Sequence, residues 1–275
     1  MRTPLRTLTA ALAAAVALTA CGGAGQTGSA AGDPDAPLRV GVSPVPHAEI
    51  LGFVADELAA DAGLDVEIVE FTDYVQPNVA LAEGELDANY FQTVPYLEEQ
   101  VATAGYEFVA LEPVHLEPLG IYSDRHASLD ELPAGATVAI ANDPANAARG
   151  LRLLEANGLI DLADTGEAAP TVLDIQDNPR ELDITEIEAA QLPRTLQDVD
   201  AAVVNGNYAI EAGLVPADDA LALEAAEGNP NANLVVVRDG DQADPRVEEL
   251  ERLLHSEEVR DFIDQTYEGA VLPAF

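Results

Sequence analysis

The feature that most constrains the fold is an alternation of strand-like and helix-like segments that starts at Leu38 and continues almost to the end of the chain. Short runs rich in Val, Ile and Ala, such as residues 38–43 and 137–141, predict strands. Residues 47–63 repeat apolar side chains at helical spacing and end at a glycine, which predicts a helix. Strands that alternate with helices favour mostly parallel sheets covered by helices, so we predict an α/β protein.

Two segments, residues 112–123 and 227–240, interrupt this alternation. We interpret them as the places where the chain passes between two lobes. On this interpretation, lobe I contains residues 38–117 together with 228–275, and lobe II contains residues 118–227. One lobe is then built from both ends of the chain and the other from its middle.

The first 37 residues are expected to lie outside the folded lobes. Arg2 and Arg6 precede an apolar run of signal-peptide length, and the sequence LTAC that ends at Cys21 looks like a lipobox. We predict a signal peptide over residues 1–20, a lipid on Cys21 and a flexible tether over 21–37, which is rich in Gly, Ala and Ser. The alternative is an ordinary secretory signal with an incidental thiol. The lipid would hold the protein at the extracytoplasmic face of a bacterial cell membrane.

The charge of the chain limits its partners. With 12 basic and 50 acidic residues the formal net charge is −38, and a field of this sign repels nucleic acids and anionic lipid surfaces. We therefore expect no nucleic acid partner and no membrane contact other than the lipid anchor. Because the acids are scattered along the chain, the pattern favours a solvated surface over a site for a cationic substrate.

One candidate binding motif follows the predicted strand at 137–141. Asp143 is suited to cap a helix that begins at Pro144, and the start of such a helix favours an anion. Asn142, Asn146 and Arg149 are spaced i, i+4 and i+7, so they are expected to share one stripe of this helix. The arrangement would suit a carboxylate. The alternative is a simple cap, with Arg149 paired to a surface acid.

Three other strand ends carry aromatic and amide side chains. Tyr74 follows the strand predicted at 66–71, Tyr90 and Phe91 end the next one, and Asn205 and Tyr208 follow the strand at 201–204. Rings mixed with neutral polar groups suit a small amphipathic ligand, because ligands bind at the carboxyl ends of parallel strands. The alternatives are core positions for the rings and a plain turn for the amides.

No pattern of a catalytic or metal site is found. The histidines are His47, His115, His126 and His255, and their spacing does not match a metal-binding motif. Phosphate-loop, dinucleotide and nucleophile-elbow motifs are also absent from the sequence. We predict a binding protein without cofactor or metal. The rival classes are a secreted enzyme with the same two-lobed fold and a surface adhesin.

Four separated motifs carry a family resemblance. VGVSPVPHAEIL, FTDYVQPNVALAEGELDANYFQTVPYL, IANDPANAARGL and EAAQLPRTLQDVDAAVVNGNYA together resemble the methionine-binding lipoproteins of ABC importers, the NlpA/MetQ family, in order along residues 38–275. The resemblance implies a two-lobed periplasmic-binding-protein fold, type II-like, in which each lobe is a mixed sheet flanked by helices and the ligand cleft lies between the lobes. It also implies a monomer that delivers L-methionine to an ABC permease and its ATPase.

The motif positions imply roles for single residues. Tyr74, Tyr90 and Phe91 would form an aromatic wall, and Asn142, Arg149 and Asn205 would hold the backbone groups of the amino acid. Asn146 and Tyr208 are further candidates for the ligand site. An acid such as Glu117 could accept from the ammonium group. Thr93 stands where family members often have His, which leaves open D-methionine, a methionine-containing dipeptide or another apolar amino acid as the ligand.

Overall fold

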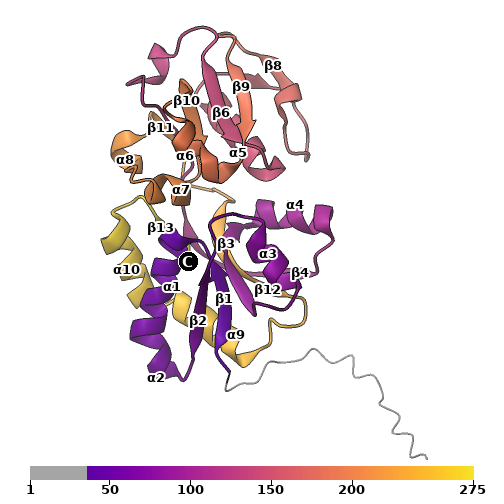
Figure 1. The fold of residues 1–275 in the computed structure, drawn as a ribbon, viewed down its shortest axis with the longest axis vertical. Coiled ribbons are helices and arrows are strands. Elements are labelled where there is room, and N and C mark those ends of the chain that lie inside the picture. Colours follow the sequence, from indigo (N-terminus) through magenta and orange to yellow (C-terminus); the bar gives the residue numbers. More distant parts are fainter. Residues whose placement is uncertain (1–35) are drawn as a thin grey trace, which may run out of the picture.

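The structure is a computed structural model that describes residues 36–275. The predicted signal peptide, Cys21 and all but the last two residues of the tether lie outside the described residues. Two lobes are stacked along the long axis of the molecule (Figure 1). Within residues 36–275, no helix combines the length and the apolar character needed to cross a membrane.

Lobe I is built on a six-stranded mixed sheet. Its strand order is β13-β4-β12-β3-β1-β2, with β1 parallel to β2 and β3, and with β12 antiparallel to β3 and β4. The strands are β1 (Leu38–Val42), β2 (Val66–Glu70), β3 (Ala88–Thr93), β4 (Phe108–Leu116), β12 (Ala232–Arg238) and β13 (Leu272–Pro273). The last two come from the C-terminal part of the chain, so both ends of the described sequence meet in this sheet.

Helices cover both faces of this sheet (Figure 1). One face carries a segment that runs from η1 (Pro44–Ala48) through α1 (Glu49–Phe53) and η2 (Val54–Ala59) to α2 (Ala60–Ala62), together with α9 (Pro245–Leu254) and α10 (Glu257–Tyr267). The other face carries α3 (Gln76–Ala82) and α4 (Val94–Ala104). Successive side chains of a strand point to opposite faces of the sheet. Val235 of β12 therefore packs against the helices of the first face, and Val236 packs against α3 and α4 on the other.

Lobe II is built on a five-stranded sheet of order β11-β5-β10-β6-β9, in which β6 is parallel to β9 and β10 while β5 is antiparallel to β10 and β11. The strands are β5 (Gly120–Tyr122), β6 (Thr137–Ala141), β9 (Asp183–Ile187), β10 (Ala201–Val204) and β11 (Ala222–Leu223). Leu151 of α5 (Pro144–Ala156) packs on one face, and Leu192 of α6 (Leu192–Thr195) and Ala209 of α7 (Gly206–Glu211) pack on the other. The smaller elements are η3 (Leu129–Glu131), β7 (Asp161–Leu162), η4 (Val172–Asp174), β8 (Ile175–Asp177), η5 (Ala189–Gln191) and α8 (Pro216–Asp219).

The chain passes between the two sheets twice, through residues 117–119 from β4 to β5 and through residues 224–231 from β11 to β12. The lobes also touch through helices, since α7 of lobe II packs against η1 of lobe I and α5 packs against α4. The first turns of α4, α5 and α7 therefore meet in the space between the sheets. The predicted α/β class is confirmed.

Two elements differ from the sequence prediction. The sequence YEFVAL, residues 106–111, predicts a strand that ends at Leu111, whereas β4 extends to Leu116, because Leu116 is buried and pairs with Ala232 of β12 and Leu272 of β13. The pattern of residues from about Pro245 to Tyr267 predicts one closing helix, whereas the structure has two, α9 and α10. Ser256 is extended, and its hydroxyl accepts from the backbone N–H of Val259, which starts a new helix.

Candidate functional site

A pocket lies between the lobes, and the empty space in and at the mouth of it, including part that is open to solvent, is about 370 Å³. It is lined from lobe I, from lobe II and from the first crossing segment. The lining residues are His47, Tyr74, Phe91, Gln92, Thr93, Tyr96, Glu117, Asn146, Arg149, Asn205, Gly206, Asn207 and Asn233. Five of the eight residues that the motif positions assign to the ligand are among them, as is Glu117, whereas Tyr90, Asn142 and Tyr208 are not.

Three rings from lobe I form an aromatic wall. The ring centroids of Tyr74, Phe91 and Tyr96 lie 5.8–6.0 Å from one another. The Tyr96 hydroxyl donates to the backbone oxygen of Tyr74 at 2.9 Å, which fixes the two residues together. Sequence reasoning missed Tyr96. Its position was nevertheless informative, because Tyr96 lies in the first turn of the helix that directly follows β3, whose end carries the predicted Tyr90 and Phe91.

Tyr90 differs from the predicted role because β3 carries a bulge. Leu234 of β12 pairs with Gln92 and Val235 pairs with Tyr90, so Phe91 has no partner on that strand. A bulge redirects the side chains beside it. Phe91 consequently reaches the pocket, whereas Tyr90 is fully buried inside lobe I and its hydroxyl contacts Nδ1 of His115.

The start of α5 brings two of its three predicted residues to the pocket. Asp143 caps the helix and accepts from the backbone N–H of Asn146 at 2.9 Å. Asn146 and Arg149 line the pocket, whereas Asn142 is exposed and does not. Asn142 precedes the cap, so its backbone is outside the helix and its side chain does not continue the predicted stripe.

Arg149 is buried and already has one acidic partner. Its Nε lies 3.1 Å from both carboxylate oxygens of Glu224, its Nη2 lies 2.5 Å from Oε2 of Glu224, and Nη2 also donates to the backbone oxygen of Glu117 at 2.9 Å. Burial opposes ionisation of Glu224, but the bonds and charge of Arg149 lower its pKa overall. The Nη1 group of Arg149 takes no part in these contacts, and sequence reasoning missed Glu224.

The start of α7 offers an acceptor and a donor. Asn205 donates through Nδ2 to Asn146 at 2.8 Å, and Asn207 accepts at Oδ1 from the Tyr74 hydroxyl at 2.6 Å. Among the described side chains, Asn205 Oδ1 and Asn207 Nδ2 are buried without a hydrogen-bond partner. Tyr208 instead lies on the far side of Tyr74, where its hydroxyl donates to the backbone oxygen of Thr72 at 3.3 Å. Asn207 was missed by sequence reasoning.

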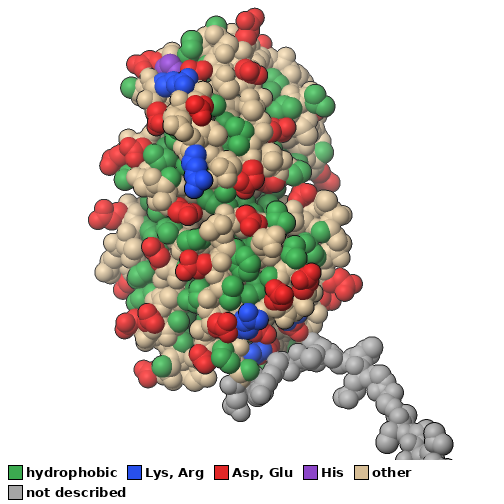
Figure 2. Space-filling model, viewed as in Figure 1, with side chains coloured by type: hydrophobic (Ala, Val, Ile, Leu, Met, Phe, Trp, Pro, Cys, Tyr) green, Lys and Arg blue, Asp and Glu red, His purple; other side chains and the backbone are tan. Residues whose placement is uncertain are grey.

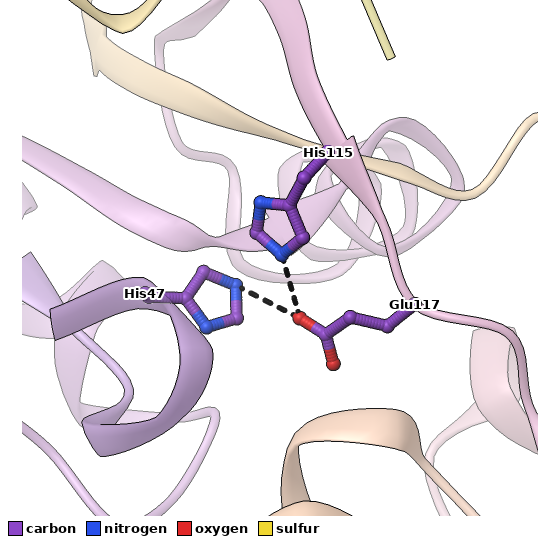
Figure 3. Close-up of side chains that lie close together, drawn as sticks. All are labelled: His47, His115 and Glu117. Atoms are coloured by element: carbon purple, nitrogen blue, oxygen red, sulfur yellow. Dashed lines mark hydrogen bonds and ion pairs between the residues drawn. The ribbon is translucent and has the colours of Figure 1, made fainter. Parts of the chain in front are cut away.

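A buried polar cluster of His47, His115, Glu117 and Asn233 lies at the pocket, which all of these residues except His115 line. Figure 3 shows that the two imidazole rings point at one carboxylate oxygen of Glu117. His115 Nε2 lies 2.8 Å and His47 Nε2 lies 3.4 Å from Oε1 of Glu117, while Asn233 Nδ2 lies 3.4 Å from the same oxygen. Burial lowers the pKa of His47 to about 4 and that of His115 to about 3, so both rings are neutral at pH 7. Burial also raises the pKa of Glu117.

The same cluster is where a metal could be held in the described part of the chain. The ligand atoms of His47, His115 and Glu117 lie within 4.8 Å of one another, and two imidazoles with a carboxylate suit a divalent transition metal. The spacing of the histidines in the sequence did not reveal this convergence, because His47 and His115 come from separate elements. In the structure, however, His115 Nε2 and Glu117 Oε1 are within hydrogen-bond distance of each other, so a metal would have to separate them.

Comparison with known proteins places the chain in a family. A family model described as NlpA lipoprotein matches residues 38–275. The chain is 43% identical over 222 residues to the D-methionine-binding lipoprotein MetQ of Escherichia coli K12, which covers 80% of this chain and 82% of that protein. It is 40% identical over 265 residues to outer membrane lipoprotein 2 of Mannheimia haemolytica, which covers 95% and 96%.

A solved structure is similar throughout the described lobes. It is a nutrient-binding protein from Burkholderia cenocepacia bound to methionine, with a TM-score of 0.84 and 45% identity over 86% of this chain and all of that one. The predicted two-lobed periplasmic-binding-protein fold is thereby confirmed, as is the resemblance drawn from the sequence motifs. The chain belongs to the NlpA lipoprotein family.

Proposed function

We propose that this protein is the substrate-binding component of an ABC importer and that it captures free methionine in the pocket between its lobes. The observation that carries the proposal is the unpaired acceptor of Asn205 and the unpaired donor of Asn207, two residues apart, in a pocket that also holds Arg149 and three rings. An ammonium group and a carboxylate satisfy these two groups at once. The names of the relatives, one of them solved with methionine, support this choice of ligand.

The polar end of the ligand accounts for part of the affinity. Its carboxylate would accept from Nη1 of Arg149 and from Nδ2 of Asn207, and its ammonium would donate to Oδ1 of Asn205. Hydrogen bonds to charged groups contribute about 1.5–3 kcal/mol each. A bound ligand would give the buried Asn205 acceptor and the buried Asn207 donor the partners that the chain itself does not supply, which favours binding.

The apolar end would lie against Tyr74, Phe91 and Tyr96. Contacts between a thioether sulfur and a ring contribute about 0.3–1.5 kcal/mol, and burial of the side chain adds about 1.5–3 kcal/mol. Micromolar binding requires about −8 kcal/mol, so the polar and apolar ends are both needed. Thr93 also lines the pocket, where its side chain is smaller than the His that family members often have. The alternative ligands are therefore D-methionine, a methionine-containing dipeptide and other apolar amino acids.

The wider role follows from the same proposal. Lobe I would comprise residues 38–117 and 228–275, and lobe II residues 118–227, closing on the ligand as a monomer. The protein would be anchored through a lipid on Cys21 at the extracytoplasmic face of the cell membrane and would pass its ligand to a permease driven by an ATPase. Its task is binding rather than catalysis.

Calorimetric titration tests the proposal. Protein refolded from denaturant, so that no ligand is carried through purification, is expected to bind L-methionine with micromolar or tighter affinity. Arg149→Ala is expected to abolish measurable binding, because the ligand carboxylate loses its cation. Arg152→Ala is the matched control, since Arg152 is exposed on the same helix one turn further on, and it is expected to bind as the wild type does.

Phe91→Ala is expected to weaken binding at least tenfold through loss of the aromatic wall. Parallel titrations with D-methionine, a Gly–Met dipeptide and leucine identify the preferred ligand. If neither enantiomer of methionine binds the refolded wild type but another compound does, the assignment of methionine as the ligand is wrong. If no amino acid binds, the proposed role as a substrate-binding protein for amino acids is wrong.

A further inference from the structure

Two tyrosines from opposite lobes are in contact beside the pocket, and we call them the tyrosine pair. Tyr74 lies between β2 and α3 of lobe I, and Tyr208 lies in the first turn of α7 of lobe II, the helix at the boundary between the lobes (Figure 1). Their ring centroids are 4.9 Å apart, with 34° between the ring planes. Tyr74 also packs against the core cluster of lobe II to which Tyr208 belongs. The pair therefore forms an apolar contact between the lobes.

The hydroxyl groups of the pair cross the same boundary in opposite directions. The Tyr74 hydroxyl donates to Oδ1 of Asn207 in lobe II at 2.6 Å, and the Tyr208 hydroxyl donates to the backbone oxygen of Thr72 in lobe I at 3.3 Å. Each lobe thus gives one donor and one acceptor. Both bonds and the ring contact require the lobes to be together, because they join residues 72–74 to residues 207–208.

Tyr208 lies one step away from the pocket. It is buried and does not line the pocket, whereas Tyr74 does line it. The ring of Tyr74 is part of the aromatic wall, and its backbone oxygen accepts from the Tyr96 hydroxyl. A change at Tyr208 therefore reaches a ligand only through Tyr74 and through the separation of the lobes. This distinguishes Tyr208 from the residues that the proposed function assigns to the ligand.

We infer that Tyr208 is a positioning residue that holds the lobes closed through Tyr74, and that it sets how long the ligand stays bound. The inference rests on the proposed function and adds to it a residue that does not touch the ligand. A ligand leaves from the open form, so a larger closed fraction slows its release. Weakening the tyrosine pair lowers this fraction, and it does so by the same factor for every ligand. A residue that contacts the ligand would instead change the preference among ligands.

Exchange of radiolabelled L-methionine against an excess of unlabelled L-methionine measures the release rate. Tyr208→Leu keeps the position apolar and removes the ring and the hydroxyl, so it is expected to raise the rate by about tenfold. Tyr208→Phe keeps the ring and loses one hydrogen bond, for which we expect about threefold. Calorimetry with L-methionine and a second ligand that binds, D-methionine or leucine, should show the affinities for both reduced by the same factor.

Tyr122→Phe is the matched control. Tyr122 belongs to the same buried cluster of lobe II as Tyr208, and its hydroxyl is buried without a hydrogen-bond partner among the described residues. This variant is expected to release methionine at the wild-type rate. Circular dichroism shows whether each variant is folded, and if Tyr208→Leu is not, the comparison of Tyr208→Phe with Tyr122→Phe decides. Wild-type release from the folded Tyr208 variants would overturn the inference, and so would losses of affinity that differ more than threefold between two ligands.

Failure of the proposed function gives a different result from failure of this inference. If the wild type binds another compound instead of methionine, the same rates are measured with that compound. If it binds no amino acid, small-angle X-ray scattering of the ligand-free proteins tests the pair. The wild type and Tyr122→Phe should then have a smaller radius of gyration than the Tyr208 variants. Equal radii would show that the pair does not hold the lobes together.

Discussion

His47 shows how one buried side chain sets a property of the whole protein. Its pKa is lowered by burial to about 4, against 6.5 for an exposed histidine. Between these two values the unfolded chain binds more protons at this residue than the folded chain does, so stability falls as the pH is lowered through this window. Glu117 has the opposite sign, because burial raises its pKa and protonation then favours the folded state.

His47→Asn is expected to flatten the pH dependence of stability. In the ligand-free wild type, the free energy of unfolding should fall between pH 7 and pH 5 by on the order of 2 kcal/mol more than in the variant, because the variant has no ring to protonate. Urea denaturation of both proteins at the two pH values measures this difference. Equal falls in the two proteins would show that His47 is not responsible.

At the residue scale, local sequence predicts what a strand end can offer but not which side chain reaches the pocket. Tyr74, Asn146 and Arg149 are found from the position of strand ends and helix starts, with the family resemblance in support. The choice of Phe91 over Tyr90 depends on a bulge against β12, which lies about 140 residues further along the chain, as its pairing with Val235 shows. Glu224 likewise becomes relevant only once the chain has folded.

At the scale of elements, α7 is a helix of lobe II that contacts lobe I beside the pocket. It packs against η1, and Gly206 in its first turn lies so close to Glu117 that a Cβ there would be 2.6 Å from the Glu117 Cβ. Glycine is needed here for close approach rather than for an unusual backbone angle. Any side chain at this position would therefore push α7 away from Glu117.

Gly206→Ala is expected to weaken ligand binding at least tenfold, because the added methyl group forces α7 away from Glu117 and holds the lobes apart. Gly52→Ala is the matched control, since nothing lies within 4 Å of a Cβ at that helical position, and it should bind normally and be more stable by up to about 1 kcal/mol. Calorimetry gives the affinities and thermal unfolding gives the stabilities. Wild-type affinity in Gly206→Ala would show that the contact does not limit closure.

Elements were the level at which sequence reasoning worked best. The alternation of apolar runs located β1, β6, β10 and the helix α5, because each is long enough for its pattern to be clear. The two errors have different causes. The extension of β4 depends on partners at the other end of the chain, and the break between α9 and α10 depends on one serine within an otherwise helical pattern.

At the scale of the whole molecule, acidic side chains are spread over the visible face of both lobes and basic ones are few (Figure 2). With a formal charge of −38, repulsion between these groups opposes the compact state. Salt screens exposed charges that are farther apart than the Debye length, which is about 10 Å at 0.1 M and about 3 Å at 1 M. The fold is therefore expected to be sensitive to ionic strength.

Raising NaCl from 0.05 to 1 M is expected to increase stability by about 1 kcal/mol or more, which corresponds to about 2–4 °C in Tm for a protein of this size class. Thermal unfolding without ligand measures the change. The increase should shrink near pH 4, where many carboxylates are protonated and the repulsion is smaller. A Tm that is unchanged or lower in salt at pH 7 would contradict the expectation.

The two segments that join the lobes, residues 117–119 and 224–231, each begin with a glutamate that bonds Arg149. Glu117 accepts through its backbone oxygen, and Glu224 accepts through its carboxylate. Bending at these segments would therefore move both partners of Arg149. Opening of the lobes there would shift the two glutamates relative to the guanidinium at the same moment. A transporter that pulls the lobes apart would thereby loosen its cargo by the same motion, without a separate release step.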